Sequence, residues 1–203
     1  QWGVHTDFQE LSLIKARFSA DRGDVRSLPT LESVVTDDER SPLMRASLIE
    51  QLGNLGSRQL PNLTAMLLRT DAPELRASAV RATRSMPPAQ RYLMLRPFIT
   101  DPVLTIRMEV AQVLAGVPAS ELRPQDIDDL KPLFEEYLAV QANHLDMPSV
   151  HMQLASFWLD RGDSAQALSA LEEAVYLNPQ LEPAVVNLVD LLRRTGKDDD
   201  AST

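Results

Sequence analysis

Few residues in this sequence have the types and spacing that catalysis or metal binding would require. The three histidines are His5, His144 and His151, and Asp146 lies between the last two, across an expected turn. Two imidazoles and a carboxylate could bind Zn²⁺ or Ni²⁺, but a histidine on a helix is more often simply packed. We therefore expect no metal site. The alternative is a weak Zn²⁺ or Ni²⁺ site formed by His144, Asp146 and His151.

The sequence contains none of the motifs that supply a catalytic nucleophile or cradle a phosphate. It has no cysteine, no phosphate-binding glycine loop, and neither the GxSxG nor the HExxH pattern. The adjacent pairs Glu135-Glu136 and Glu172-Glu173 point to different sides of their expected helices, so a solvated surface explains them. We expect no enzymatic activity and no cofactor. The missing cysteines exclude disulfides, thiolate metal sites and covalently attached haem within this chain.

The chain has a net charge of −9, and this charge is unevenly distributed. Residues 1–117 are nearly neutral, at +1, whereas residues 118–203 sum to −10. The acidic part would repel nucleic-acid phosphates, so we expect no nucleic-acid partner. It suits a basic protein surface, although acidic residues that only keep a surface solvated give the same pattern. No run of about 18 apolar residues occurs, so we expect no membrane span.

The stretch from Pro148 to Leu181 has the pattern of a helical hairpin. Apolar residues recur at helical spacing on both sides of Arg161-Gly162-Asp163, and Asn178-Pro179 ends the pattern. The residues with this period are Leu154, Ala155, Trp158, Ala167, Leu168, Leu171, Ala174, Val175 and Leu177. The alanines among them would let the two helices approach closely, while Trp158 and Leu171 would fill the space beside them.

The hairpin pattern recurs after 34 residues. The matching pairs are Leu154 with Leu188, Gly162 with Gly196, and Ala167 with Ala201. This period and pattern resemble the tetratricopeptide repeat. His151 is one departure, since that position most often holds an aromatic residue in the family. The resemblance implies a concave groove, lined by the first helix of each hairpin, that suits an extended peptide or a partner helix. The matching lining positions are Met152, Ser156, Leu159, Asp160, Val186, Asp190, Arg193 and Arg194.

A second period, of about 31 residues, organises the chain before residue 118. Arg45, Arg76 and Arg107 lie 31 residues apart, each in an expected helix that follows another helix and an acidic turn. This pattern resembles the short form of the HEAT repeat. Stacked repeats need polar ties, so we interpret the arginines as a structural ladder in preference to a ligand site. Asp71 and Asp101 are expected to accept hydrogen bonds from free N–H groups at the start of the following helix.

Three further helices are predicted from their local sequence. A helix is expected from Asp7 to Ala20, and Pro97 is expected to kink or shorten the helix that contains it. The apolar residues on one face of the first helix are Phe8, Leu11, Ile14 and Phe18. Acidic residues favour the start of a long helix at Asp126, which we expect to continue to about Asn143.

The change of period divides the expected fold into three parts, with the boundary in the proline-containing segment Ala119–Gln125. HEAT-like helical repeats occupy residues 1–117, and a linker with a long connecting helix occupies residues 118–147. Tetratricopeptide hairpins, one complete and one truncated, occupy residues 148–203. Together these parts predict an all-α fold, an α-solenoid that winds into a right-handed superhelix.

The order of these parts resembles the C-terminal half of large bacterial periplasmic multihaem cytochrome c proteins that contain repeats. That resemblance implies a non-catalytic docking module exported with an electron-transfer protein, and hence a periplasmic location. The haem motifs of that family would lie upstream, so no haem-binding residue is transferred to this chain. A protein-binding scaffold is the function we favour. A structural spacer or self-association module is the alternative, and a metal-binding or enzymatic unit is disfavoured.

The last helix, from Glu182 to Arg194, fits the first half of a hairpin whose second half would start near Ala201. We therefore expect the chain to be excised from a longer protein, with residues 197–203 frayed. An uncovered apolar stripe on the last helix would be costly to expose, and a second copy of the chain could dock on it to form a dimer.

Overall fold

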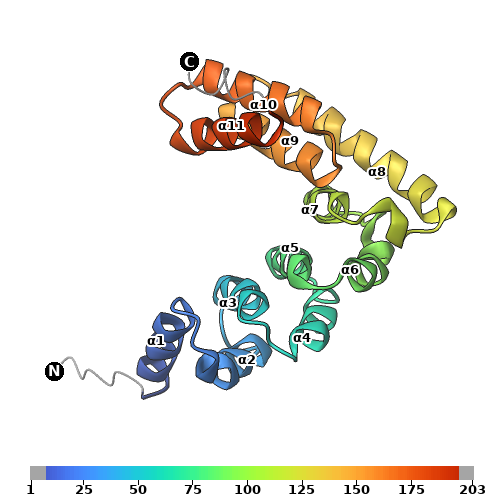
Figure 1. Cartoon of the computed structure of the whole chain (residues 1–203). Coiled ribbons are helices and arrows are strands. Elements are labelled where there is room, and N and C mark those ends of the chain that lie inside the picture. The colour runs from blue at the N-terminus through green and yellow to red at the C-terminus, as the bar shows by residue number, and fades with distance from the viewer. Residues whose placement is uncertain (1–7, 197–203) are drawn as a thin grey trace. The chain divides into compact units, whose positions relative to one another are not determined.

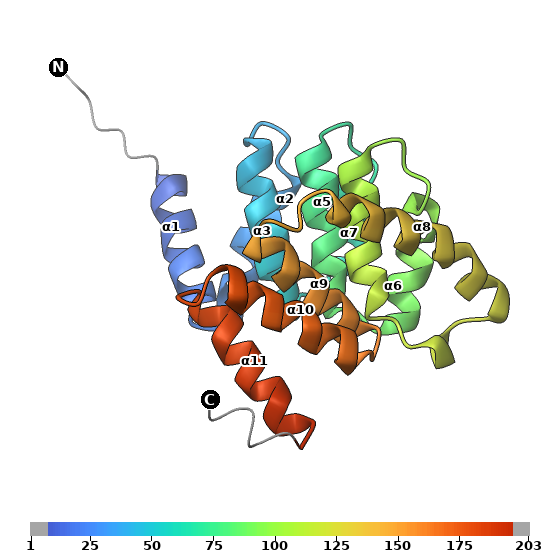
Figure 2. The ribbon, with the colours of Figure 1, turned by 90° about the horizontal axis from the view of Figure 1, so that it is seen from above.

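The structure, a computed structural model, describes residues 8–196. These residues form helices α1 to α11 with no strand among them, so the all-α prediction is confirmed for this range (Figures 1 and 2). The α-helices are Phe8–Ala20 (α1), Leu28–Thr36 (α2), Pro42–Asn54 (α3), Leu60–Leu67 (α4), Pro73–Ala82 (α5), Pro88–Leu95 (α6), Leu104–Ala115 (α7), Pro124–Ala142 (α8), Pro148–Asp160 (α9), Ser164–Leu177 (α10) and Glu182–Arg194 (α11). Short 3₁₀ helices lie at Val25–Ser27, Thr83–Ser85, Arg96–Phe98 and Ala119–Glu121.

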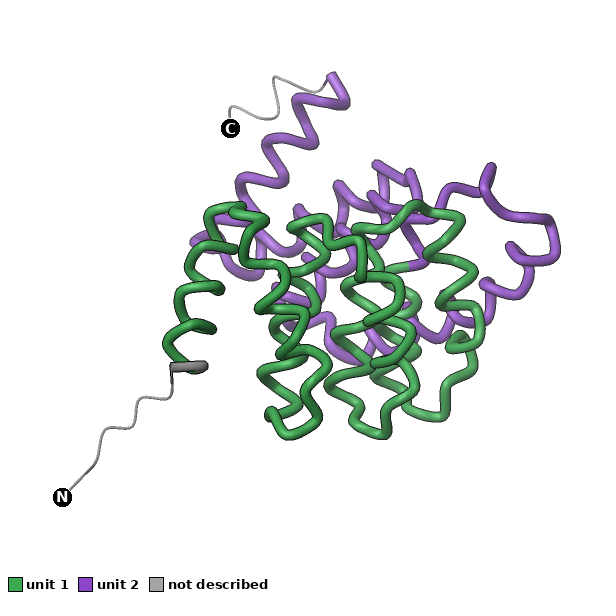
Figure 3. Tube along the Cα trace, turned by 90° about the horizontal axis from the view of Figure 1, so that it is seen from below, with its two compact units in different colours: residues 1–113 green, residues 114–203 purple. Residues whose placement is uncertain are grey.

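The chain divides into two compact units, residues 1–113 and residues 114–203, drawn in green and purple in Figure 3. The division falls within α7, before the segment Ala119–Gln125 in which the change of period places the boundary. The assignment of three parts stays a prediction.

Proline and serine residues define where the helices of unit 1 begin. Pro42 and Pro73 each occupy the first turn of a helix, where a missing N–H costs little. Ser41 caps α3 by accepting a hydrogen bond from the Met44 N–H at 3.3 Å. Pro97 has the predicted effect, because α6 ends at Leu95 and the chain continues as a 3₁₀ turn.

The helical hairpins of unit 1 stack closely. Helix α3 packs against α2 and α5, and α5 packs against α4, so neighbouring hairpins lie side by side (Figure 2). Gly53 marks the closest approach: a Cβ added there would lie 2.9 Å from Ser85 Oγ and 3.3 Å from the Ala82 carbonyl oxygen. A glycine near the end of α3 therefore allows the backbones to meet.

Each arginine of the 31-residue period binds a turn between helices, as the ladder hypothesis expects. Arg45 donates to the Val35 carbonyl at 2.9 Å and pairs with Asp38 at 2.7 Å. Arg76 donates to both carboxylate oxygens of Asp101, at 2.9 and 3.3 Å. Arg107 donates to the backbone carbonyl of the same aspartate at 2.6 Å. These guanidinium groups tie helices to turns.

Only one of the two predicted aspartate caps is present. Asp101 is buried and accepts a hydrogen bond from the Val103 N–H at 2.9 Å, just before α7. The cap of α5 is instead Ala72, which makes no side-chain hydrogen bond, and Asp71 is exposed. The prediction for Asp71 was wrong. The Asp101 carboxylate accepts from the N–H two residues further on, whereas the residue two positions after Asp71 is Pro73, which has no N–H to donate.

A further arginine, not part of the 31-residue period, links three helices of unit 1. Arg81 on α5 donates to Glu50 on α3 at 2.8 Å and to Glu109 on α7 at 2.6 Å. Partial burial opposes the charge on Arg81, but the hydrogen bond to Glu50 and the charges of both glutamates outweigh it and raise the pKa of the guanidinium. This bridge adds a second polar tie across the stack.

Helix α1 packs through a different face from the one its large apolar residues mark. Leu13, Ala16 and Ala20 are buried, whereas Ile14 and Phe18 are exposed, as is Leu11. The face that is buried where α1 contacts α2 thus combines one leucine with two alanines, and the predicted apolar face stays outside. The side chain of Phe8 is outside the described part of the chain.

The first α-helix that lies wholly within unit 2 is α8, which starts at Pro124, two residues before the predicted start. Its aromatic residues meet α9 in a compact cluster. Phe157 of α9 stacks on fully buried Tyr137 with ring centroids 4.9 Å apart, and it meets Phe134 edge to face at 5.5 Å. Arg161 lies over the Phe134 ring at 4.8 Å. Aromatic packing therefore holds α8 and α9 together.

Candidate functional site

The α9–α10 hairpin forms where the sequence predicts the tetratricopeptide-like pair. Gly162 ends α9 with φ +78°, a left-handed conformation that glycine adopts without strain. Asp163 then caps α10 by accepting a hydrogen bond from the Gln166 N–H at 3.0 Å. Gly196, the residue matched to Gly162 at the 34-residue period, has φ +74° after α11. The two glycines occupy equivalent helix ends.

Small residues on the hairpin allow close contact between its helices. Ala155, Ala167 and Ala174 are all buried, as the sequence predicts. Leu171 is buried with Ala155 and Ala167 in a cluster that also includes Leu191 and Leu192 of α11. This shared core fixes α11 against the hairpin and determines which of its residues face the neighbouring helices.

A groove of about 230 Å³ lies between α9 and α11, with α10 forming part of its floor. Figure 2 shows the three helices, in orange and red, packed in sequence. The residues that line the groove are Met152, Ala155, Ser156 and Leu159 from α9, Leu171 from α10, and Asn187, Asp190, Leu191 and Arg194 from α11. This volume suits one or two side chains of a bound segment better than a complete small molecule.

The groove has an apolar floor and a polar wall. Buried Leu171 and Leu191 lie at its base, while Asn187, Asp190 and Arg194 are exposed along α11. Within residues 8–196, neither Asp190 nor Arg194 has an ion-pair partner, so both charges are available to a ligand. An amide, a carboxylate and a guanidinium on one wall can bond to the backbone and to charged side chains of an extended peptide.

The structure brings together part of the predicted groove lining. Five of the eight residues line one groove: Met152, Ser156, Leu159, Asp190 and Arg194. Asp160 and Arg193 are exposed but do not line it. Val186 lies instead in a separate, open depression of about 540 Å³, which Pro179, Gln180, Glu182 and Val185 also line.

Sequence reasoning missed Asn187 because it placed the groove face of α11 about one residue out of register. The groove-facing residues on α11 are Asn187, Asp190, Leu191 and Arg194, at helical spacing. The signal that identifies this face is Leu191, which is apolar and buried in the shared core. A prediction anchored on that leucine would have selected Asn187 and left out Val186.

His144 and His151 do not form a metal site within residues 8–196, and His5 lies outside the described residues. Buried His151 uses its Nε2 to bond the Leu145 carbonyl at 2.8 Å, which closes the turn between α8 and α9, whereas His144 is exposed. No group of three histidine or carboxylate side chains within residues 8–196 is arranged to hold a metal ion. In the same range, no helix combines the length and the apolar character that a membrane crossing needs.

Comparison with known proteins does not assign the chain to a family. The sequence matches no protein-family model, and neither a curated protein nor a solved structure is significantly similar to it.

Proposed function

We propose that the chain is a non-catalytic scaffold of helical repeats whose unit 2 binds an extended, basic peptide in the groove between α9 and α11. The observation that carries this proposal is the groove itself, in which a buried apolar floor lies beside an exposed wall of Asn187, Asp190 and Arg194. A floor of this kind takes an apolar side chain, and the wall supplies hydrogen bonds to the peptide backbone.

The charge of the acidic part of the chain favours a basic partner. Residues 118–203 sum to −10, so a positively charged peptide is attracted before it makes contact. Asp190 then offers a carboxylate in the groove that pairs with no other residue of the range 8–196, and Arg194 offers donors to carbonyl oxygens. The partner class is therefore a peptide that pairs one apolar side chain with a neighbouring lysine or arginine.

The resemblance to tetratricopeptide and HEAT repeats extends the proposal to architecture. Stacked hairpins in unit 1 and equivalent glycines after α9 and α11 support a solenoid built from repeats. By the same resemblance, the chain would serve a periplasmic multihaem electron-transfer protein as its docking region. A haem stain and absorbance spectrum of the natural full-length protein would test that part, since the chain itself has no cysteine for covalent haem.

A self-association module is the second candidate, and one observation favours it. The open depression beside α11 is lined by Pro179, Val185 and Val186, and Val186 is 56% exposed. A second copy of the chain could cover this apolar surface. Light scattering across a wide concentration range, with Val186→Glu as the variant, distinguishes a dimer from a monomeric peptide-binding scaffold.

Selection from a random peptide library tests the proposed function. The full chain is immobilised, and enriched peptides are measured by calorimetry and mapped by backbone amide shifts. We expect enriched sequences to contain a basic residue next to an apolar one, with shifts concentrated on α9 and α11. Failure to enrich any peptide, or shifts confined to other helices, would contradict the proposal.

A further inference from the structure

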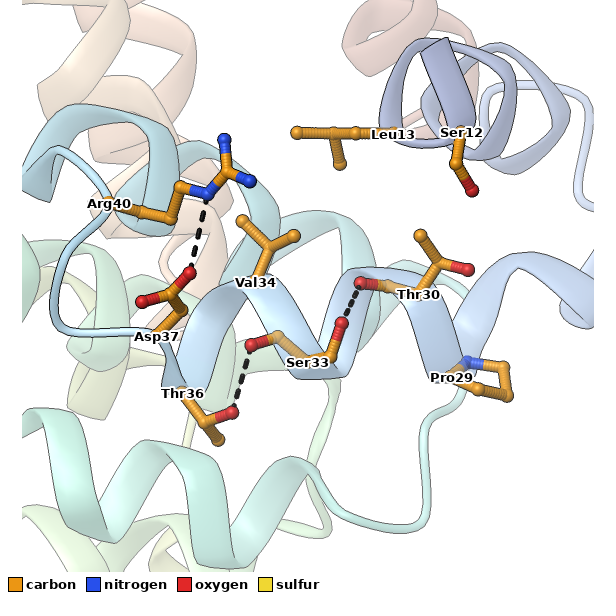
Figure 4. Close-up of a pocket in the computed structure, with 9 residues that line it drawn as sticks. All are labelled: Ser12, Leu13, Pro29, Thr30, Ser33, Val34, Thr36, Asp37 and Arg40. Atoms are coloured by element: carbon orange, nitrogen blue, oxygen red, sulfur yellow. Dashed lines mark hydrogen bonds and ion pairs between the residues drawn. The ribbon is translucent and has the colours of Figure 1, made fainter. Parts of the chain in front are cut away.

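A larger cavity lies in unit 1, between α1 and α2, and its chemistry differs from that of the unit 2 groove. Its volume is about 600 Å³, within the range of pockets that hold small ligands. Figure 4 shows the residues that line it: Ser12, Leu13, Pro29, Thr30, Ser33, Val34, Thr36, Asp37 and Arg40. Buried Leu13 and Val34 provide an apolar surface, and polar groups surround it.

Arg40 is the strongest polar group in this cavity. Its Nε donates to Asp37 Oδ2 at 3.3 Å, and its side chain is only 24% exposed. Among residues 8–196, its two terminal amino groups have no partner. In Figure 4 the guanidinium points into the space between α1 and α2, toward the side chain of Leu13. A half-buried guanidinium with two free amino groups is arranged to bind a planar anion.

The hydroxyl groups divide into two kinds. Ser33 donates to the Thr30 carbonyl at 2.8 Å, and Thr36 donates to the Ser33 carbonyl at 2.9 Å, so both offer acceptor lone pairs. The hydroxyls of Ser12 and Thr30 bond to no other described residue. They stand away from Arg40, on the far side of Leu13 and Val34 (Figure 4). The cavity thus has a cationic end, an apolar middle and a hydroxyl end.

We infer that this cavity binds a carboxylate that carries a short apolar group and an amide, as a peptide segment does. The carboxylate would accept from the two free amino groups of Arg40, and the apolar group would lie on Leu13 and Val34. The amide would bond to the hydroxyls of Ser12 and Thr30. This site lies wholly in unit 1 and does not depend on the function proposed for unit 2.

The local charges favour a carboxylate over a phosphate. Asp37 already forms an ion pair with Arg40, and Glu39, the residue before Arg40, is exposed. A dianion would face the same single guanidinium together with greater repulsion from these carboxylates. A singly charged carboxylate matches the two-donor fork of one arginine.

Amide-shift titrations of the full chain with three small probes test this inference. N-acetyl-leucine has a terminal carboxylate, N-acetyl-glutamate α-amide has a side-chain carboxylate, and N-acetyl-leucinamide has none. We expect saturable shifts on α1 and α2 with one or both acids, and affinity at least ~10-fold lower with the neutral amide. The preferred acid shows whether a chain terminus or an acidic side chain is the source. Equal affinity for the neutral amide would overturn the inference, as would tighter binding of inorganic phosphate or no shifts at all.

Matched variants give an independent result. Arg40→Gln should abolish the shifts, whereas Arg58→Gln, at an exposed arginine outside the cavity, should preserve them. Asp37→Asn removes the competing charge and should strengthen binding of the acids, whereas a merely structural role for Asp37 predicts weaker binding. Spectra away from α1 and α2 report folding, and Arg40→Lys provides a second variant if Arg40→Gln unfolds. Retained binding in either Arg40 variant would contradict the inference that the two terminal amino groups of Arg40 bind the carboxylate.

Discussion

Units 1 and 2 are both built from helical hairpins, but different interactions join their neighbouring helices. In unit 1, arginines on α3, α5 and α7 bond to turns, to a helix-end carbonyl and to glutamates of other helices. In unit 2, alanines and an aromatic cluster provide the contacts. Polar ties are directional and fix register, whereas apolar packing is non-directional and sensitive to volume. The two units should therefore respond differently to mutation and to salt.

The largest effect is expected at the aromatic cluster of unit 2. Phe157→Ala removes a buried ring that contacts Tyr137 and Phe134, and should lower the free energy of unfolding by about 4 kcal/mol. Hydrogen exchange in α8 and α9 measures the loss. Tyr176→Ala, at a site 80% exposed on α10, is the control and should change stability by less than ~0.5 kcal/mol. Similar losses in both variants would show that the cluster does not hold unit 2 together.

The next largest effect is expected at the buried ion pair of unit 1. The side chains of Arg76 and Asp101 are 15% and 4% exposed, so Arg76→Met leaves a carboxylate buried without its partner. We expect a loss of about 3 kcal/mol in hydrogen-exchange protection of α5 and α7. Adding Asp101→Asn should recover part of this loss, because the uncompensated charge disappears. Arg69→Met, at an exposed arginine, is the control. An equal loss in that variant would contradict the hypothesis that the arginines of the 31-residue period stabilise the stacked helices.

A smaller, salt-dependent effect is expected at the Arg81 bridge. Its side chain is 37% exposed, so solvent screens its pairs with Glu50 and Glu109. Arg81→Met should cost about 1 kcal/mol at low ionic strength and markedly less in 1 M salt. The cost of Phe157→Ala should not decrease with salt. If salt changes both costs equally, the distinction between polar and apolar ties fails.

The sequence predicted those parts of the fold that depend on local pattern. Gly162 and Asn178-Pro179 delimit α10 as expected, and the spacing of Arg45, Arg76 and Arg107 identified residues that tie helices to turns. Both kinds of signal are local, because a helix end or a repeat period can be read from neighbouring residues alone.

What the sequence could not show depends on contacts between distant segments. Helix α1 contacts α2 and buries Leu13, Ala16 and Ala20, whereas Leu11, Ile14 and Phe18 remain exposed. Arg81 finds two glutamates about 30 residues away on either side, which no motif marks. The cavity at Arg40 likewise requires α1 and α2 to be placed together before its lining is visible.

The most direct measurement compares two carboxylates in unit 2 for their effect on peptide affinity. Asp190 lines the groove, whereas Glu173 is exposed on α10 outside it, so Asp190→Asn and Glu173→Gln change the net charge equally. With the selected basic peptide, calorimetry should show at least ~10-fold weaker binding for Asp190→Asn. The affinity of Glu173→Gln should stay within ~2-fold of the original chain. Equal losses in the two variants would mean that only the overall acidic charge attracts the peptide, which would contradict binding in the groove.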